Sequence, residues 1–248
     1  MVLEPVTADP LTAEPAIAEP PLTLTEAAAR HGAYRWVEQR LFELTGAWSA
    51  GPGVPPALRV HLFGASAQHG AHAAGWYDRL PVLVQVDRDG LTRPLGPLLG
   101  PLVAQLADGA PTPPGAPTPP GAPETAPSAG LRFAAGLYRV VLPRLLDSYR
   151  LHATRLSPVA DEPSRQALAA VVRDEEAELG AATALLAAVA AQEGGPAAEL
   201  MEEAAKALED TLAKARTEAG AAAGPGGARR PEAPPEDLVP WSDGRCGW

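Results

Sequence analysis

The sequence predicts an all-α protein built on four long helices. In four separate stretches, apolar residues recur at intervals of three and four, the period of a helix that buries one face. Much of the 46% hydrophobic fraction is alanine and only 5% of residues are aromatic, which favours a helical core of small side chains. Stretches rich in proline and glycine separate the four segments and mark where each helix ends.

The charge balance excludes several classes of partner. A net charge of −10 and a pI near 5.0 argue against nucleic acid and anionic membrane surfaces, because both are bound through clustered basic residues. The single cysteine, Cys246, fits a reducing compartment. With no apolar run of about 18 residues and no signal-peptide pattern at the N-terminus, the sequence predicts a cytoplasmic protein.

The first helix follows an acidic arm rich in proline and alanine at residues 1–22, which is predicted to be disordered. Thr23 and Glu26 have the spacing of a capping box, and the helical pattern runs from there to about Gly46. Glu38 lies on the inward face of this helix. Two interpretations stay open: Glu38 is a buried functional carboxylate, or it lies at the margin and pairs with Arg35 or Arg40. The apolar stripe of this helix consists of Tyr34, Val37, Leu41, Leu44 and Trp48.

The second helix is predicted from about Pro56 to Leu80, after a short turn that makes it an antiparallel neighbour of the first. His69 lies near the centre of its apolar stripe, and His72 lies one turn further on, at the edge. These histidines are either ligands of a site or core residues whose nitrogens are satisfied by backbone or water. The stripe consists of Leu58, Leu62, Ala65, His69, Ala73, Trp76 and Leu80.

A long connection at residues 81–130 follows the second helix. It holds a short helix from Pro97 to about Ala107 and a Pro-rich linker at about 109–129, in which a six-residue unit is repeated. Such a composition favours an extended, solvated spacer.

The third and fourth helices are predicted at about 131–156 and from Pro163 to about 192. Pro143 is expected to kink the third helix. Glu175 is central on the stripe of the fourth helix and Glu178 lies at its edge, repeating the three-residue spacing of the two histidines. Asp174 and Glu176 are predicted to face solvent. The inward stripe of the third helix consists of Leu131, Ala135, Tyr138, Leu142, Leu145, Tyr149 and His152.

The C-terminal part is predicted as a charged accessory helix at 196–220 and a disordered tail at 221–248. The apolar side of the helix is thin, so both a docked and a free helix stay open. Trp241 and Trp248 in the tail either form a motif for a protein partner or fold back on the core.

Over residues 23–192 the pattern of a short first loop and a long second connection resembles the ferritin-like superfamily. The resemblance implies an up-down four-helix bundle with a long crossover between helices 2 and 3. It also implies a dimetal site with one Glu from each of helices 1 and 3 and a Glu-x-x-His pair from each of helices 2 and 4. Glu38 matches the first position, His69 and His72 hold the second spacing, and Glu175 and Glu178 hold the fourth. The third helix departs from the pattern, because it offers no inward carboxylate.

Two functions follow from this resemblance. The first is a divergent ferritin-like protein that binds iron, manganese or zinc through mixed imidazole and carboxylate ligands. The second is a non-enzymatic scaffold or interaction protein that has lost the metal centre. Whether a reaction is catalysed stays open. The candidate ligands are Glu38, His69, His72, Glu175 and Glu178.

Overall fold

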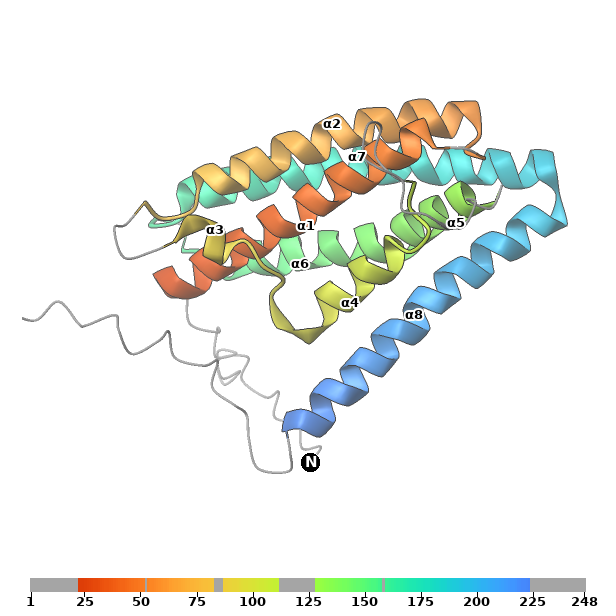
Figure 1. The fold of residues 1–248 in the computed structure, drawn as a ribbon. Helices are drawn as coiled ribbons and strands as arrows, with labels where there is room; N and C mark the ends of the chain where they lie inside the picture. The colour runs from red at the N-terminus through yellow and green to blue at the C-terminus, as the bar shows by residue number, and fades with distance from the viewer. Residues whose placement is uncertain (1–21, 52, 83–86, 112–127, 158, 224–248) are drawn as a thin grey trace, which may run out of the picture.

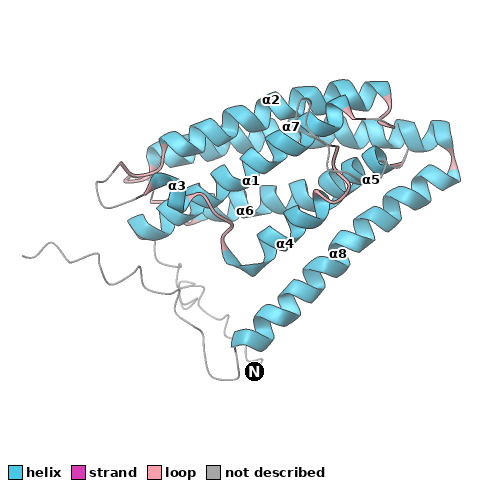
Figure 2. Ribbon diagram, in the orientation of Figure 1, coloured by secondary structure: helices cyan, strands magenta, loops and turns pink. Residues whose placement is uncertain are grey.

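The computed structural model describes residues 22–51, 53–82, 87–111, 128–157 and 159–223. All regular secondary structure in these ranges is helical, as predicted (Figure 2). No described helix has the length and apolar character needed to cross a membrane. Residues 1–21 of the predicted arm, most of the linker at 109–129 and nearly all of the tail at 221–248 lie outside the described residues. The elements are α1 (Leu24–Ala50), α2 (Pro56–Asp78), α3 (Arg88–Leu91), α4 (Gly96–Leu106), α5 (Ala129–Gly136), the π-helix η2 (Leu137–Val141), α6 (Leu142–Thr154), α7 (Glu162–Glu193) and α8 (Gly195–Ala223).

Helices α1 and α2 form an antiparallel pair (Figure 1). The predicted capping box begins α1, since Thr23 and Glu26 each bond the other's backbone N–H. The helix continues past Gly46 to Ala50, further than predicted. At Gly46 a Cβ atom would lie 3.0 Å from the Ser66 hydroxyl of α2, so this glycine permits a close approach of the two helices.

The segment from α5 to α6 is continuous, and a π-helix precedes Pro143 in it. The chain forms a π-helix just before Pro143, in which the Leu142 N–H donates to the carbonyl of Leu137, five residues back. Pro143 has no N–H, so it leaves the usual acceptor four residues earlier without a donor and favours rearrangement of this turn. The predicted stripe of this segment is buried throughout.

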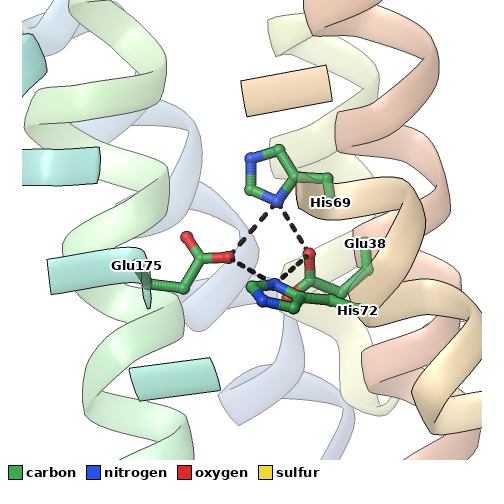
Figure 3. A group of neighbouring side chains, drawn as sticks. All are labelled: Glu38, His69, His72 and Glu175. Carbon is green, nitrogen blue, oxygen red and sulfur yellow. Dashed lines mark hydrogen bonds and ion pairs between the residues drawn. The ribbon is translucent and has the colours of Figure 1, made fainter. Parts of the chain in front are cut away.

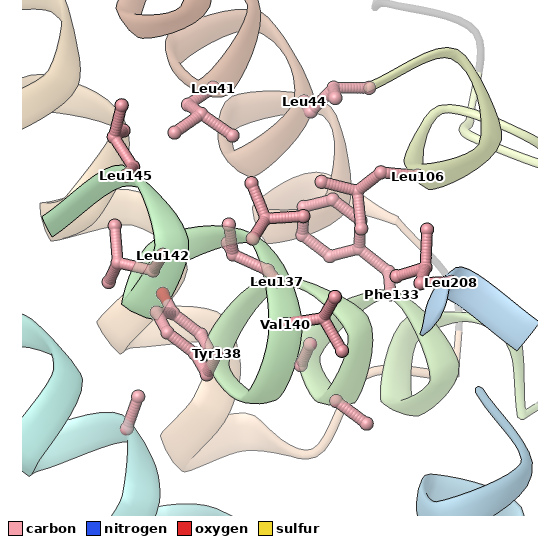
Figure 4. Packing of buried hydrophobic residues seen from close by; sticks show 14 of the residues in the cluster. Leu41, Leu44, Leu106, Phe133, Leu137, Tyr138, Val140, Leu142, Leu145 and Leu208 are labelled. Atoms are coloured by element: carbon pink, nitrogen blue, oxygen red, sulfur yellow. The ribbon is translucent and has the colours of Figure 1, made fainter. Parts of the chain in front are cut away.

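Helix α8 packs against α4 and α5, so the docked alternative is the one observed. Figure 4 shows Leu208 of α8 and Leu106 of α4 beside Phe133 of α5. Gly136 allows this contact, because a Cβ there would lie 2.5 Å from a methyl group of Leu208. The short predicted helix of the long connection, found as α4, therefore serves as the platform for α8.

The remaining helices lie around one interior. α7 packs on both α2 and α6. In Figure 1, α1 and α7 run in one direction while α2 and the α5–α6 segment run in the other. Inward side chains from α1, α2, α6 and α7 therefore face one another, which places the polar groups described next in one buried volume.

Candidate metal centre

Glu38 of α1 is completely buried and is the central carboxylate of the site. Its Oε2 atom lies 2.7 Å from His69 Nδ1, and its Oε1 atom accepts a hydrogen bond from the Tyr149 hydroxyl. The alternative in which Glu38 pairs with Arg35 or Arg40 is wrong. Those arginines instead reach exposed carboxylates on the protein surface, Arg35 at Asp89 and Arg40 at Glu43.

Four buried side chains bring donor atoms together between α1, α2 and α7 (Figure 3). Oxygen Oε1 of Glu175 lies 3.0 Å from Nδ1 of His72 and 3.3 Å from Nδ1 of His69. Oxygen Oε2 of Glu38 lies 3.6 Å from the same His72 nitrogen. One donor atom from each of Glu38, His69, His72 and Glu175 lies within 4.8 Å of the other three. The sequence prediction that these four residues converge is confirmed.

Glu178 is close to this group but does not contribute to its four donors. Its Oε1 atom lies 3.5 Å from Nε2 of His69, on the far side of the ring from Glu38. The carboxylate also accepts hydrogen bonds from the Tyr138 hydroxyl at 3.0 Å and from Gln68 at 3.1 Å. These contacts hold Glu178 beside the His69 ring, and its role as a metal ligand stays a prediction.

Asp174 occupies the corresponding place beside His72. Its Oδ2 atom lies 3.6 Å from Nε2 of His72, so the prediction that Asp174 only faces solvent is wrong. Glu176, by contrast, forms an exposed ion pair with Arg150. Asp174 and Glu178 are four residues apart on α7 and therefore lie on one face, a spacing from which the role of Asp174 could have been inferred.

Both histidines orient their ring nitrogens in the same way. Each turns Nδ1 toward Glu38 and Glu175 and Nε2 toward an outer carboxylate. In metal sites a carboxylate on the second ring nitrogen orients a ligating histidine. The Nε2 contacts here are ion-pair contacts of 3.5 and 3.6 Å, and Nε2 of His69 has no hydrogen-bond partner among the described residues. The arrangement therefore leaves both Nδ1 atoms for the shared interior.

Two tyrosines supply hydrogen bonds where the third helix has no carboxylate. Tyr149 of α6 donates to Glu38, and Tyr138 of η2 donates to Glu178. Burial, together with the charge of the neighbouring glutamates, raises the pKa of both hydroxyls well above the usual value. Both tyrosines therefore stay protonated as donors at neutral pH.

The histidines and Glu38 of this site favour their charged forms although they are buried. Burial alone would lower the pKa of both histidines, but hydrogen bonds to the glutamates outweigh it, raising the pKa of His72 to about 10 and that of His69 well above its usual value. Burial likewise opposes ionisation of Glu38, yet the bonds from the histidines lower its pKa. Without a metal ion, two imidazolium groups therefore face three glutamates.

A second pair of buried histidines lies nearby, and no pattern in the sequence singled it out as a pair. The rings of His31 and His152 are 5.7 Å apart, beside Tyr34 and Trp76. Neither ring nitrogen of His152 has a hydrogen-bond partner among the described residues. Burial is the main cause that lowers the pKa of His31 to about 4 and that of His152 to about 3, so both rings are neutral at pH 7.

We expect this pair to make the metal-free protein sensitive to acid. As the pH falls below about 6.5, both histidines become protonated in the unfolded chain but stay neutral in the folded protein. The free energy of unfolding therefore decreases until the pH reaches the folded pKa values of about 4 and about 3. Between pH 7 and pH 5 each histidine should lower the free energy of unfolding by about 2 kcal/mol. Urea unfolding in a chelator should therefore show a smaller loss of stability for His152→Leu than for the wild type. An equal loss in both proteins would contradict this prediction.

Comparison with known proteins adds no relative: no family model, curated protein or solved structure matches the chain.

Proposed function

We propose that the protein binds one transition metal ion, iron, manganese or zinc, inside a ferritin-like up-down four-helix bundle. The observation that carries the proposal is the buried group of Glu38, His69, His72 and Glu175. An apolar interior accepts charged groups only when they are paired or coordinated, and these four converge on one point.

The arrangement of the helices supports the ferritin-like architecture. A turn of a few residues joins α1 to α2, whereas residues 79–128 separate α2 from α5. The α5–α6 segment runs in the same direction as α2, as a long crossover requires (Figure 1). The candidate donors come from α1, α2 and α7, and the segment α5–α6 contributes the tyrosines.

The donor set fits a transition metal. Donors around a tetrahedral ion with bonds near 2.1 Å are about 3.4 Å apart. The four distances between an imidazole nitrogen and a carboxylate oxygen run from 2.7 to 3.6 Å here, and all four donors lie within 4.8 Å of one another. Mixed imidazole and carboxylate donors suit zinc, iron and manganese. Oxygen Oε2 of Glu175 is buried without a hydrogen-bond partner among the described residues, which leaves it available as a further donor. An ion held there would supply a Lewis-acidic centre or, for iron and manganese, a redox-active one.

The charges of the site predict that metal binding is coupled to the release of protons. A divalent ion requires neutral imidazoles, so it replaces the protons of His69 and His72 and leaves the net charge of the site unchanged. Binding at pH 7 should release about two protons per ion. Because protons compete for the ligands, affinity should rise with pH up to about 10, where His72 loses its proton without a metal.

Calorimetric titration tests the proposal. We expect one Zn²⁺ or Mn²⁺ per chain, and Fe²⁺ under argon, with a binding enthalpy that depends on the ionisation enthalpy of the buffer as release of about two protons requires. Protein grown in metal-supplemented medium should carry one such ion by mass spectrometry. Substoichiometric metal together with no binding would favour the scaffold that has lost its centre.

A further inference from the structure

A surface pocket of about 400 Å³ lies between α2 and α7, next to the proposed centre. Four of its nine lining residues are small: Ala71 and Gly75 on α2, and Ala167 and Ala170 on α7. A Cβ atom added at Gly75 would meet no other atom within 4 Å. The pocket is thus open because the sequence places residues without bulk on both of its walls.

His72 connects this pocket to the buried donors. Among the four candidate ligands, His72 is the member that lines the pocket, and it is 9% exposed whereas the other three are 0% exposed. Its Nδ1 atom faces Glu38 and Glu175, and its Nε2 atom faces Asp174. One ring therefore spans the distance between the pocket and the interior.

Other sides of the donor group are closed by hydrogen-bonded side chains. Tyr149, completely buried, covers Glu38 from α6. Tyr138 and Gln68 hold Glu178 across the far side of His69. Passage on those sides would require breaking buried hydrogen bonds, which costs more than displacing water from an open pocket.

Acidic groups stand along the pocket side. Asp174 is one turn beyond the lining residue Ala170 on α7, and its side chain is 38% exposed. Its Oδ1 atom pairs with Arg173 at 3.2 Å, while its Oδ2 atom faces His72. Asp78 lines the pocket, as does Arg79, whose charge partly offsets the attraction. Carboxylates at the mouth of a cleft raise the local concentration of cations and so speed their association.

We propose that this pocket is the route by which a metal ion reaches the centre, with Asp174 as the first carboxylate on the route and His72 as the receiving ligand. The inference rests on the proposed metal binding and adds the direction of access. It makes Gly75 and Ala170, two lining residues outside the donor group, determinants of the loading rate.

Stopped-flow absorbance with Co²⁺ tests the route on the full chain. In the double variant Gly75→Leu with Ala170→Leu, we expect association to slow by about tenfold while the equilibrium affinity stays within about twofold, because a blocked route slows association and dissociation alike. Gly64→Leu is the matched control, since Gly64 is on the same helix and its Cβ position is equally open. This control should load at the wild-type rate.

Asp174→Asn provides an independent arm. Removing its charge should slow Co²⁺ association at low ionic strength, and the difference from the wild type should shrink as salt screens the remaining charges. Equal loading rates in the double variant and in Gly64→Leu would overturn the inference, as would a loss of affinity as large as the loss of rate. No Co²⁺ binding by the wild type would instead refute the metal proposal itself.

Discussion

Replacing His69 with alanine should abolish stoichiometric metal binding. His69 Nδ1 lies within 3.3 Å of both Glu38 and Glu175, so its loss removes one donor and the group that holds two others together. Affinity should fall by more than about 100-fold, because even partners of metal ligands cost 10- to 100-fold when mutated. Metal content by mass spectrometry and calorimetric titration measure the effect.

His61→Ala is the matched control for this prediction. His61 is also on α2, but it packs against Tyr138 outside the donor group, so its removal should leave stoichiometry and affinity unchanged. If the two variants retained metal equally, His69 would have no part in binding. The imidazole and carboxylate groups would then serve only to pair with one another.

Glu38→Ala should cause the largest loss of stability in the metal-free protein. At pH 7 it removes the acceptor of both His69 and Tyr149, two side chains that are completely buried. Removing one partner of a buried ion pair costs about 3–5 kcal/mol. Urea unfolding followed by circular dichroism in a chelator measures this loss.

The control for Glu38→Ala is Glu43→Ala on the same helix. Glu43 forms an exposed pair with Arg40, and the loss of such a pair costs at most about 1 kcal/mol. Similar losses in the two variants would mean that the buried network contributes no more than a surface ion pair.

Helical periodicity was enough to predict the inward face of each long helix, and with it the convergence of four candidate ligands. His69 and Glu175 lie at the centres of their apolar stripes, where a polar side chain must meet a partner across the interior. The apolar stripe does not predict, however, which residue on another helix is that partner. Tyr149 is separated from Glu38 by 111 positions, and only the packing of α6 against the other helices brings them together.

Residues at the stripe margins were harder to assign. Asp174 and Glu178 differ by a small rotation about α7, yet one was predicted to be solvated and the other to be a ligand, whereas both lie beside an outer histidine nitrogen. Periodicity resolves such angles poorly, because tilt and crossing between helices decide which margin is covered. The docking of α8 was unresolved for a related reason: its platform, α4, belongs to the long connection and not to the four main helices.

The π-helix at Leu137–Val141 sets the rotational register of everything that follows it on this segment. A π-turn holds one residue more than a regular helical turn and so keeps the helices before and after it in phase around that extra residue. If the same residues closed into an ordinary α-helix, all that follows would rotate by roughly 100° and shift by about 1.5 Å relative to what precedes it. Tyr149 and His152 would then leave their partners on α1 together, although neither had been mutated. The geometry of this one turn therefore decides whether the tyrosine and histidine of α6 reach the interior.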